Sequence, residues 1–306
     1  MLKLASVICV VLSLLFVIFR KRDGHCLKNE FRLKSMIECH SLLTCNDIKD
    51  IELHELIGHG AVKNVYRAIW KNNTIAVSYL RDKKYESDFW HGLRMLRKYS
   101  HSPLIVKLIG FCKNKNLIMT EYHKNGDGFK ILEKINKKTD NVSVRLKLCL
   151  NYVKILEMLH NATAITTVNC DSNDLGKTLS QLLITDDLTL ILNDVDSLAE
   201  MKNSKLIKCG KREIFGDFVA PEQLWNSTKP FNDEEMKEYD EKTDIWKAAT
   251  LCNYFLGDVV NAITVRYRLF DLHSKCKSVD PSERPNAKDL VREYSRVLSE
   301  LDGDWL

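Results

Sequence analysis

The sequence has little proline and glycine and no strong excess of charge of one sign. Its 306 residues include five Pro and 12 Gly, too few for collagen-like or linker-like stretches. The net charge is only +5 and is spread along the chain, which argues against nucleic-acid binding. No internal repeat with a solenoid period is present. Apolar residues make up 45% and charged residues 28%, so we expect a globular protein of one two-lobed domain or two small ones.

An apolar run stands at the N-terminus. Residues 4–19 are uncharged and mostly apolar, between Lys3 and the basic residues 20–22. At about 16 residues, the run is short for a spanning helix and long for a signal-peptide core. Basic residues follow it, and no small-residue cleavage site does. We therefore expect an uncleaved signal-anchor over residues 1–22, with a cleaved signal peptide as the alternative.

The orientation of this anchor depends on opposing signals. The basic residues 20–22 favour a cytosolic C-terminal side. Ten cysteines and four N-glycosylation sequons, which begin at Asn72, Asn141, Asn161 and Asn226, favour an oxidising lumen. Cys26, Cys39 and Cys45 cluster after the anchor, as in a small stapled segment. The alternative is that the later cysteines are ordinary buried thiols: Cys112, Cys149, Cys170, Cys209, Cys252 and Cys276.

Hydrophobic periodicity predicts a β-rich part followed by a helical part. Strands are expected over 51–57, 64–70, 74–80, 106–112 and 117–120, with a turn at 72–73 and a helix over 88–99. A long amphipathic helix over 144–160, short strands near 166–170 and 188–192, and then helices and loops to residue 301 follow. We predict an α+β fold: a Cys-containing lead-in over 23–46, a small β-rich lobe over 47–120 and a larger helical lobe over 124–301. This order resembles the bilobal protein-kinase fold.

Two glycines after the first predicted strand resemble the glycine-rich loop of kinases. Gly58 and Gly60 match G-x-G-x-x-G-x-V, except that Lys63 stands at the third glycine. Glycines there let backbone N–H groups approach phosphate oxygens, although a simple β-turn also uses them. The third strand, which would carry V-A-I-K, has Ser78 in place of the lysine. We expect Lys63 to compensate by approaching the same phosphates; the alternative is a surface lysine beside an inactive site.

The helix after the third strand departs from the kinase pattern, whereas the segment at the hinge position is compatible with it. Gly92 stands where a helix Glu usually pairs with the missing lysine, and losing both avoids an unpaired buried carboxylate. Residues Glu121, Tyr122 and His123 then occupy the position of the hinge, whose backbone would hydrogen-bond an adenine.

Residues 168–181 (VNCDSNDLGKTLSQ) occupy the position of the catalytic loop H-R-D-x-x-x-x-N. Asp171 and Asp174 are both candidates for the base, and Asp-Leu spacing alone favours Asp174. Gln181 is a candidate amide ligand of a second metal ion, and Asp194 falls at the metal-binding Asp of D-F-G. The alternative function of any of these carboxylates is a helix cap or a turn.

The motifs of the helical part are the most regular. Glu222 belongs to an intact Ala-Pro-Glu, Asp244 opens a D-x-W, and Arg284 lies in Ser-Glu-Arg-Pro, where it usually pairs with that Glu. Asp194 precedes Ala220 by 26 residues, which leaves room for an activation loop. Gly216-Asp217-Phe218 lies too close to Ala220 to be the metal-binding motif. These are structural residues and do not prove catalysis.

Four strings carry a specific resemblance. The chain resembles the protein O-mannose kinase family over nearly its whole length through CDSNDLGKTLSQ (170–181), GDFVAPEQLW (216–225), YDEKTDIWK (239–247) and PSERP (281–285). The family usually has Pro at the position of Gly176. The lysine in the glycine-rich loop also resembles the with-no-lysine kinases.

The resemblance implies a type II membrane protein of the endoplasmic reticulum with a lumenal catalytic domain. It implies ATP-dependent phosphorylation, with Mg²⁺ or Mn²⁺, of the 6-hydroxyl of mannose in an O-linked GalNAc–GlcNAc–Man trisaccharide on α-dystroglycan, which permits extension of a laminin-binding glycan. It also implies that Asp171 is the base. We expect the sugar-binding surface near Gly216–Asp217, and no nucleic-acid partner.

Two other functions remain open on the residues alone. A pseudokinase fits the absent strand lysine, the absent helix Glu and the irregular catalytic loop, but gives no reason for Lys63, Asp171 and Asp194. A lumenal protein kinase that acts on Ser, Thr or Tyr is compatible with the fold. Transfer of phosphate to a sugar, to a peptide or to neither distinguishes the three.

Overall fold

The computed structural model describes residues 26–27, 29–161, 164–202, 206–210 and 212–303. These residues form two compact units. The first unit comprises the described residues up to Glu86 together with Lys107–Tyr122, and the second comprises Ser87–Val106 together with the chain from His123 onward. The expected signal-anchor over residues 1–22 lies outside the described residues.

The predicted single-pass membrane topology is corrected here. In the part of the chain that the structure describes, no helix is both long enough and apolar enough to cross a membrane. The expectation of a type II protein of the endoplasmic reticulum membrane therefore has no support among the residues that the structure describes.

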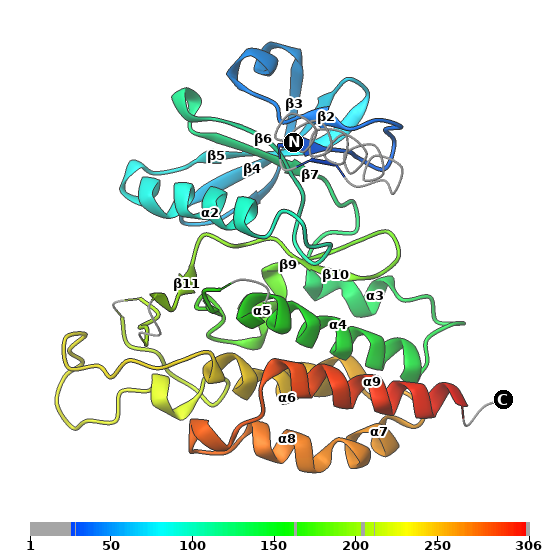
Figure 1. Ribbon diagram of the computed structural model, residues 1–306, viewed down its shortest axis with the longest axis vertical. Coiled ribbons are helices and arrows are strands. Elements are labelled where there is room, and N and C mark those ends of the chain that lie inside the picture. Colours follow the sequence, from blue (N-terminus) through cyan, green and yellow to red (C-terminus); the bar gives the residue numbers. More distant parts are fainter. Residues whose placement is uncertain (1–25, 28, 162–163, 203–205, 211, 304–306) are drawn as a thin grey trace, which may run out of the picture. The chain divides into compact units, whose positions relative to one another are not determined.

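The first unit is built on an antiparallel five-stranded sheet with the order β3-β4-β5-β7-β6. The strands of this unit are β1 (Glu30–Phe31), β2 (His40–Ser41), β3 (Ile51–His59), β4 (Lys63–Trp70), β5 (Asn73–Leu80), β6 (Leu108–Cys112) and β7 (Leu117–Glu121), labelled in Figure 1 where there is room. All five strands predicted for this part are present. The turn between β4 and β5 is Lys71–Asn72, both with positive φ, as two-residue hairpins of this kind require, and Asn73 already belongs to β5.

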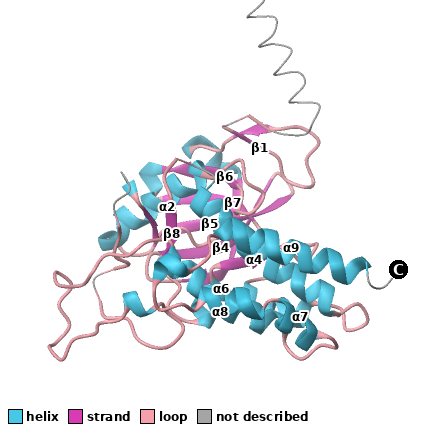
Figure 2. Ribbon diagram, turned by 60° about the horizontal axis from the view of Figure 1, so that its bottom comes forward, coloured by secondary structure: helices cyan, strands magenta, loops and turns pink. Residues whose placement is uncertain are grey.

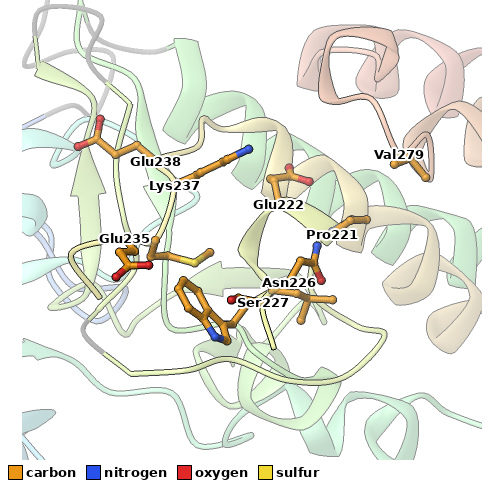
Figure 3. A pocket seen from close by; sticks show the side chains of 11 residues that line it. Pro221, Glu222, Asn226, Ser227, Glu235, Lys237, Glu238 and Val279 are labelled. Atoms are coloured by element: carbon orange, nitrogen blue, oxygen red, sulfur yellow. The ribbon is translucent and has the colours of Figure 1, made fainter. Parts of the chain in front are cut away.

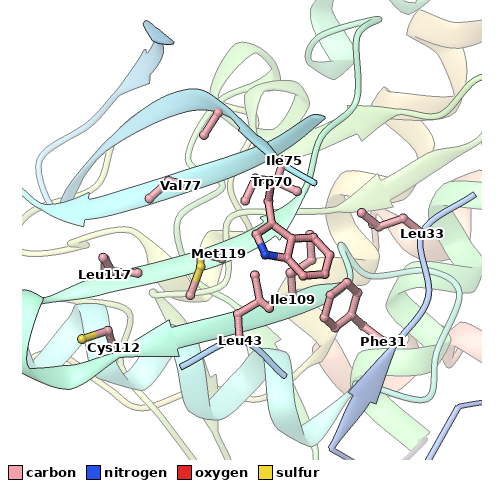
Figure 4. Packing of buried hydrophobic residues seen from close by; sticks show 11 residues of the cluster. Phe31, Leu33, Leu43, Trp70, Ile75, Val77, Ile109, Cys112, Leu117 and Met119 are labelled. Atoms are coloured by element: carbon pink, nitrogen blue, oxygen red, sulfur yellow. The ribbon is translucent and has the colours of Figure 1, made fainter. Parts of the chain in front are cut away.

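The lead-in packs on one face of this sheet. Phe31, Leu33 and Leu43 join side chains of β4–β7 in a buried cluster, which Figure 4 shows around Trp70. Disulfides Cys26–Cys39 and Cys45–Cys112 tie the same segment together and to β6. The predicted stapled segment is therefore part of the core of the first unit.

The second unit is mainly helical, as Figure 2 shows. Its helices are α2 (Glu86–Lys98), α3 (Ile131–Lys134), α4 (Val142–Asn161), α5 (Leu175–Ser180), α6 (Lys242–Leu256), α7 (Ala262–Arg268), α8 (Phe270–Cys276) and α9 (Ala287–Gly303). Short antiparallel pairs join β9 (Leu182–Ile184) to β10 (Leu190–Leu192) and β8 (Thr167–Asn169) to β11 (Leu198–Glu200).

Helix α4 is the centre of this unit. It packs against both α6 and α9, and most of its side chains are buried, as expected for a helix covered on several sides (Figures 1 and 2). A disulfide between Cys149 and Cys252 joins α4 to α6. Cys276 is the one free cysteine among the described residues, and burial raises the pKa of its thiol to about 12. The expectation that the later cysteines are plain thiols thus holds for Cys276 alone.

Candidate active site

The glycine-rich segment forms the hairpin between β3 and β4. Gly58 pairs with Val65, and the Gly60 N–H donates to the Lys63 carbonyl at 2.9 Å. The Arg81 guanidinium, beyond the end of β5, donates to the Gly60 carbonyl at 2.8 Å. The turn is therefore tied to the neighbouring strand, while a Cβ at Gly60 would meet nothing within 4 Å. This leaves the open backbone that a phosphate-binding loop needs.

Strand register places Lys63 and Ser78 on one face of the sheet. Lys63 pairs with Leu80 and Val65 pairs with Ser78, and paired residues point to the same side. Lys63 and Ser78 are therefore diagonal neighbours, at about 7–8 Å by ordinary sheet geometry. The core cluster around Val77 and Trp70 lies on the opposite face. A lysine at position 63 thus starts from the same face as a strand lysine at position 78 would.

The hinge segment begins at the end of β7. The Glu121 N–H donates to the Lys107 carbonyl at 3.0 Å, and its carboxylate accepts from the Lys107 N–H at 2.9 Å. The chain passes from the first unit to the second after Tyr122, so His123 already belongs to the second.

Gly92, at the position of the usual helix Glu, is explained by close packing. It is buried in α2, and a Cβ built there would lie 3.2 Å from the Asp196 Cβ and 3.4 Å from the Asp196 Cα. The helix is held against this segment by His91 Nε2, which lies 2.6 Å from the Leu198 carbonyl oxygen. Even a Cβ at position 92 would be closer to Asp196 than ordinary van der Waals contact, so glycine suits this close approach.

Asp171 lies in the loop after β8, beside a cation that the motif analysis missed. Lys177 Nζ, on α5, is 2.6 Å from Asp171 Oδ2. Burial lowers the pKa of Lys177, but its contact with Asp171 and the charges of Asp171, Asp194 and Asp196 outweigh burial and raise that pKa overall. Lys177 is therefore a firmly charged ammonium among three carboxylates. The signal in the sequence was a lysine within the catalytic loop, six residues after Asp171.

Asp174 has a different environment. It is the N-cap of α5, and its carboxylate accepts the Lys177 backbone N–H at 2.7 Å. A carboxylate at this position also interacts favourably with the helix dipole. Asp174 is thus the helix cap that the sequence analysis left open as an alternative.

Gln181 connects the catalytic loop to Asp194. Its side chain is 1% exposed; Nε2 donates to the Asp171 carbonyl, and Oε1 accepts from Asn169 Nδ2 at 3.0 Å. Its backbone carbonyl accepts the N–H groups of Asn193 and Asp194 at 2.9 and 3.2 Å. Gln181 therefore orients both carboxylates through the backbone. Within the described residues, no group of three or more His, Cys, Asp or Glu side chains is placed to hold a metal ion by itself.

The structural motifs of the second unit form a buried ion pair. The Arg284 guanidinium, 2% exposed, donates to both oxygens of Glu222 at 2.6 and 2.8 Å. Asp217 is placed by Trp246, whose indole N–H donates to its carbonyl at 3.4 Å. The bidentate pair of Arg284 and Glu222 fixes the segment after residue 220 onto the helical part of the unit.

A disulfide links the catalytic loop to the segment between Asp194 and Ala220. It joins Cys170, the residue before Asp171, to Cys209. The loop that carries Asp171 is therefore joined covalently to the segment between Asp194 and Ala220.

A cavity of about 510 Å³ lies beside the segment after Ala-Pro-Glu. Figure 3 shows it lined by Glu222, Glu235, Glu238 and Lys237 together with Asn226 and Ser227, and Trp225 and Met236 add apolar surface. Glu222 is already paired with Arg284, and the lining otherwise sets one ammonium against the carboxylates of Glu235 and Glu238, which does not suit the phosphates of ATP. Neither Asp171 nor Asp194 lines it.

The four predicted sequons lie in different settings. Asn72 is in the β4–β5 turn, and Asn226 is exposed at the cavity just described. Asn141 Oδ1 accepts the Val144 N–H at 3.0 Å and so caps α4, whereas Asn161 ends that helix. Their glycosylation stays a prediction.

Comparison with known proteins agrees with this geometry. The family model described as "Protein tyrosine and serine/threonine kinase" matches residues 51–253. The human protein O-mannose kinase is 42% identical over 90% of this chain and 81% of its own length, and the chicken (Gallus gallus) protein O-mannose kinase is 41% identical over 90% and 80%. The bovine mitogen-activated protein kinase kinase kinase 7 is 22% identical over 84% of this chain and 45% of its own. The chain is therefore a transferase of the protein-kinase superfamily and belongs to the protein O-mannose kinase family.

Proposed function

We propose that the protein transfers the γ-phosphoryl group of ATP to the 6-hydroxyl of O-linked mannose in a GalNAc–GlcNAc–Man trisaccharide on α-dystroglycan. The names of its relatives support a mannose acceptor. The observation that carries the chemistry is the ion pair between Asp171 and Lys177. Of the two candidate aspartates, Asp171 lies beside a cation, whereas Asp174 caps a helix.

Asp171 is the proposed base. Its carboxylate is a quarter exposed, so a hydroxyl can reach it, and Lys177 holds one of its oxygens. Asp171 would accept the proton of the mannose hydroxyl while the phosphoryl group is transferred in line to the hydroxyl oxygen. Lys177 keeps the carboxylate oriented and lowers the electrostatic cost of negative charge nearby.

We assign nucleotide binding to Gly58, Gly60 and Lys63 and to the backbone of Glu121, Tyr122 and His123. The open turn at Gly60 and the shared face of Lys63 and Ser78 support this assignment. Asp194 suits a divalent cation, because carboxylate oxygens are the ligands that hard cations prefer; when bound, such a cation neutralises phosphate charge. We give Gln181 a positioning function, since its amide is already hydrogen-bonded within the loop.

Two alternatives remain and are tested by the same experiment. A pseudokinase would bind ATP and transfer nothing. A protein kinase would place the phosphate on a Ser, Thr or Tyr hydroxyl. The retained Asp171–Lys177 pair and the disulfide beside it favour an active enzyme over a pseudokinase.

The test incubates the purified protein with ATP, Mg²⁺ or Mn²⁺, and either the trisaccharide or a Ser/Thr/Tyr peptide mixture, with mass spectrometry of the products. We expect a phosphate on the sugar and none on the peptides. Asp171→Asn should abolish transfer, whereas the matched variant Asp174→Asn should keep it.

Phosphate on the peptides instead of the sugar would show that the acceptor is a protein. ATP binding without any product, under both metal ions, would establish the pseudokinase. Loss of transfer in Asp174→Asn but not in Asp171→Asn would move the base to Asp174.

A further inference from the structure

Helix α6 carries a lysine with no exposed surface. Lys247 is 0% exposed, and lysine is among the residues least often fully buried. It follows Asp244 by one helical turn and has no part in the phosphoryl transfer described above. A buried ammonium is costly unless it is paired and hydrogen-bonded, so its contacts indicate its function.

Lys247 contacts the catalytic loop through Ser172. Its Nζ donates to Ser172 Oγ at 2.5 Å and lies 3.8 Å from Asp244 Oδ1. The Ser172 hydroxyl donates in turn to the Asn169 carbonyl at 2.6 Å. Because that hydrogen is already used, the Ser172 oxygen is left to accept from Lys247, which fixes the direction of the relay.

Asp244 binds the backbone N–H of Asn169, the residue whose carbonyl accepts from Ser172. Its Oδ2 accepts the Asn169 backbone N–H at 3.0 Å and lies 3.1 Å from His160 Nε2. Helix α6 therefore holds both backbone polar groups of Asn169: the N–H directly, and the carbonyl through Ser172. Asp171 lies between Asn169 and Ser172, in a turn closed by the Ser172 N–H, which donates to the Cys170 carbonyl at 2.9 Å.

The energetics argue against a purely stabilising function for Lys247. Burial lowers the pKa of Lys247, and the negative charges of Asp244 and Glu222 only partly oppose this. Buried ion pairs are frequently no more stabilising than apolar side chains of the same volume. Lys247 is buried in spite of this desolvation cost, and its ammonium binds Ser172, the residue after Asp171. These facts indicate that Lys247 controls the geometry of the loop that carries Asp171.

We propose that Lys247 is a positioning residue, which acts with Ser172 to hold the turn that carries Asp171 in its catalytic orientation. This inference rests on the proposed function of Asp171 as the base. It adds Lys247 and Ser172 to the machinery of phosphoryl transfer, although neither is expected to touch a substrate.

The test compares Lys247→Met, Ser172→Ala, the double variant and the control Arg145→Met. Arg145, on α4, is another buried cation of the second unit. It is paired with Asp140 and donates to the Phe255 carbonyl near the C-terminal end of α6, so these contacts do not involve residues 169–172. We measure kcat and the KM for ATP per folded molecule, and hydrogen exchange of the Asn169 and Ser172 amides in the full chain.

For Lys247→Met we expect kcat to fall by about 10²-fold with the KM for ATP changed less than about twofold, since a displacement near 1 Å has that effect on rate. Ser172→Ala should lower kcat in the same way, and the double variant should be no worse than Lys247→Met alone. Both amides should exchange faster in Lys247→Met. Arg145→Met should change stability but neither kcat nor these amides.

Equal kcat for Lys247→Met and Arg145→Met, or additive losses in the double variant, would overturn the proposal. If Lys247→Met does not fold, Ser172→Ala decides, and an unchanged kcat there overturns it. If the wild-type protein phosphorylates no sugar, the proposed function fails separately. Amide exchange then decides the positioning claim, and exchange that Lys247→Met leaves unchanged overturns it.

Discussion

Single residues with the same chemistry differ here because of what they touch. Asp171 and Asp174 are three positions apart, yet one faces an ammonium at 2.6 Å and the other accepts a backbone N–H at 2.7 Å. The match to Asp-Leu favoured Asp174 as the base. A short motif contains no information on which carboxylate caps the next helix, so it could not exclude Asp174. The motif does not single out Lys177 for the same reason: the electrostatic environment of its ammonium depends on Asp171, Asp194 and Asp196, which only the folded chain brings near it.

Lys177→Met should lower kcat by about 10²-fold, because it removes a preorganised charge beside the base. The free energy of unfolding should change by less than about 1 kcal/mol, since the pair is partly exposed. Steady-state kinetics and urea unfolding check both. The matched control is Lys124→Met, which removes a surface pair with Asp186 at 3.5 Å. Equal kcat in the two variants would contradict the assignment of Lys177.

His273 should make the protein less stable in acid. Its imidazole is half-buried, 2.7 Å from the Tyr294 hydroxyl, and burial lowers its pKa to about 4. The unfolded chain, with an ordinary pKa near 6.5, takes up the proton first, so stability is lost as pH falls from about 7 toward 4. His273→Gln should remove at most about 2 kcal/mol of the difference in unfolding free energy between pH 7 and pH 5. Urea unfolding at both pH values measures it, and an unchanged difference would refute it.

At the scale of elements, several departures from the kinase pattern have local explanations. Gly92 allows α2 to approach Asp196, and Ser78 shares a sheet face with Lys63. The strands and the long helices were predictable because their hydrophobic periods are long and regular. The short strands predicted near 166–170 and 188–192 are present as β8 and β10. Strands β9 and β11 and helix α5 are too short for their sequence to distinguish them from loops, and their existence depends on tertiary contacts.

The disulfide between Cys170 and Cys209 should support catalysis more than stability. The double variant Cys170→Ser/Cys209→Ser should lose about tenfold in kcat, because the turn that carries Asp171 loses a covalent anchor. The control is Cys26→Ser/Cys39→Ser in the first unit, which should keep its kcat. Rates are compared at a temperature where both variants are folded. Full kcat in the Cys170/Cys209 variant would show that the bond has no function in the active site.

At the scale of the whole molecule, the described disulfides are divided between the two units. Cys26–Cys39 and Cys45–Cys112 lie in the first unit, and Cys149–Cys252 and Cys170–Cys209 in the second. The pairing follows from which strands and helices meet. Cysteine spacing indicated only the stapled lead-in, because connectivity cannot be read from positions along the chain.

Cys149→Ala/Cys252→Ala should be the most destabilising of the double cysteine variants. This bond joins residues 103 positions apart, and long closed loops restrict the unfolded chain most. We expect a loss of about 2–5 kcal/mol in unfolding free energy, against a smaller loss for Cys26–Cys39, whose cysteines are 13 positions apart. Guanidinium unfolding of both variants tests the order, and the reverse order would contradict it.

The sequence by itself determined the family, the α+β architecture and the set of polar residues available for phosphoryl transfer. Periodicity and local motifs carry that information because they depend on neighbours along the chain. Only the tertiary structure decided which carboxylate caps α5, which cation meets Asp171, and that Lys247 reaches Ser172 from a helix 75 positions away. Only the contact of Lys247 joins residues distant in sequence, but all three depend on the local backbone conformation, burial and distance, which a linear pattern does not contain.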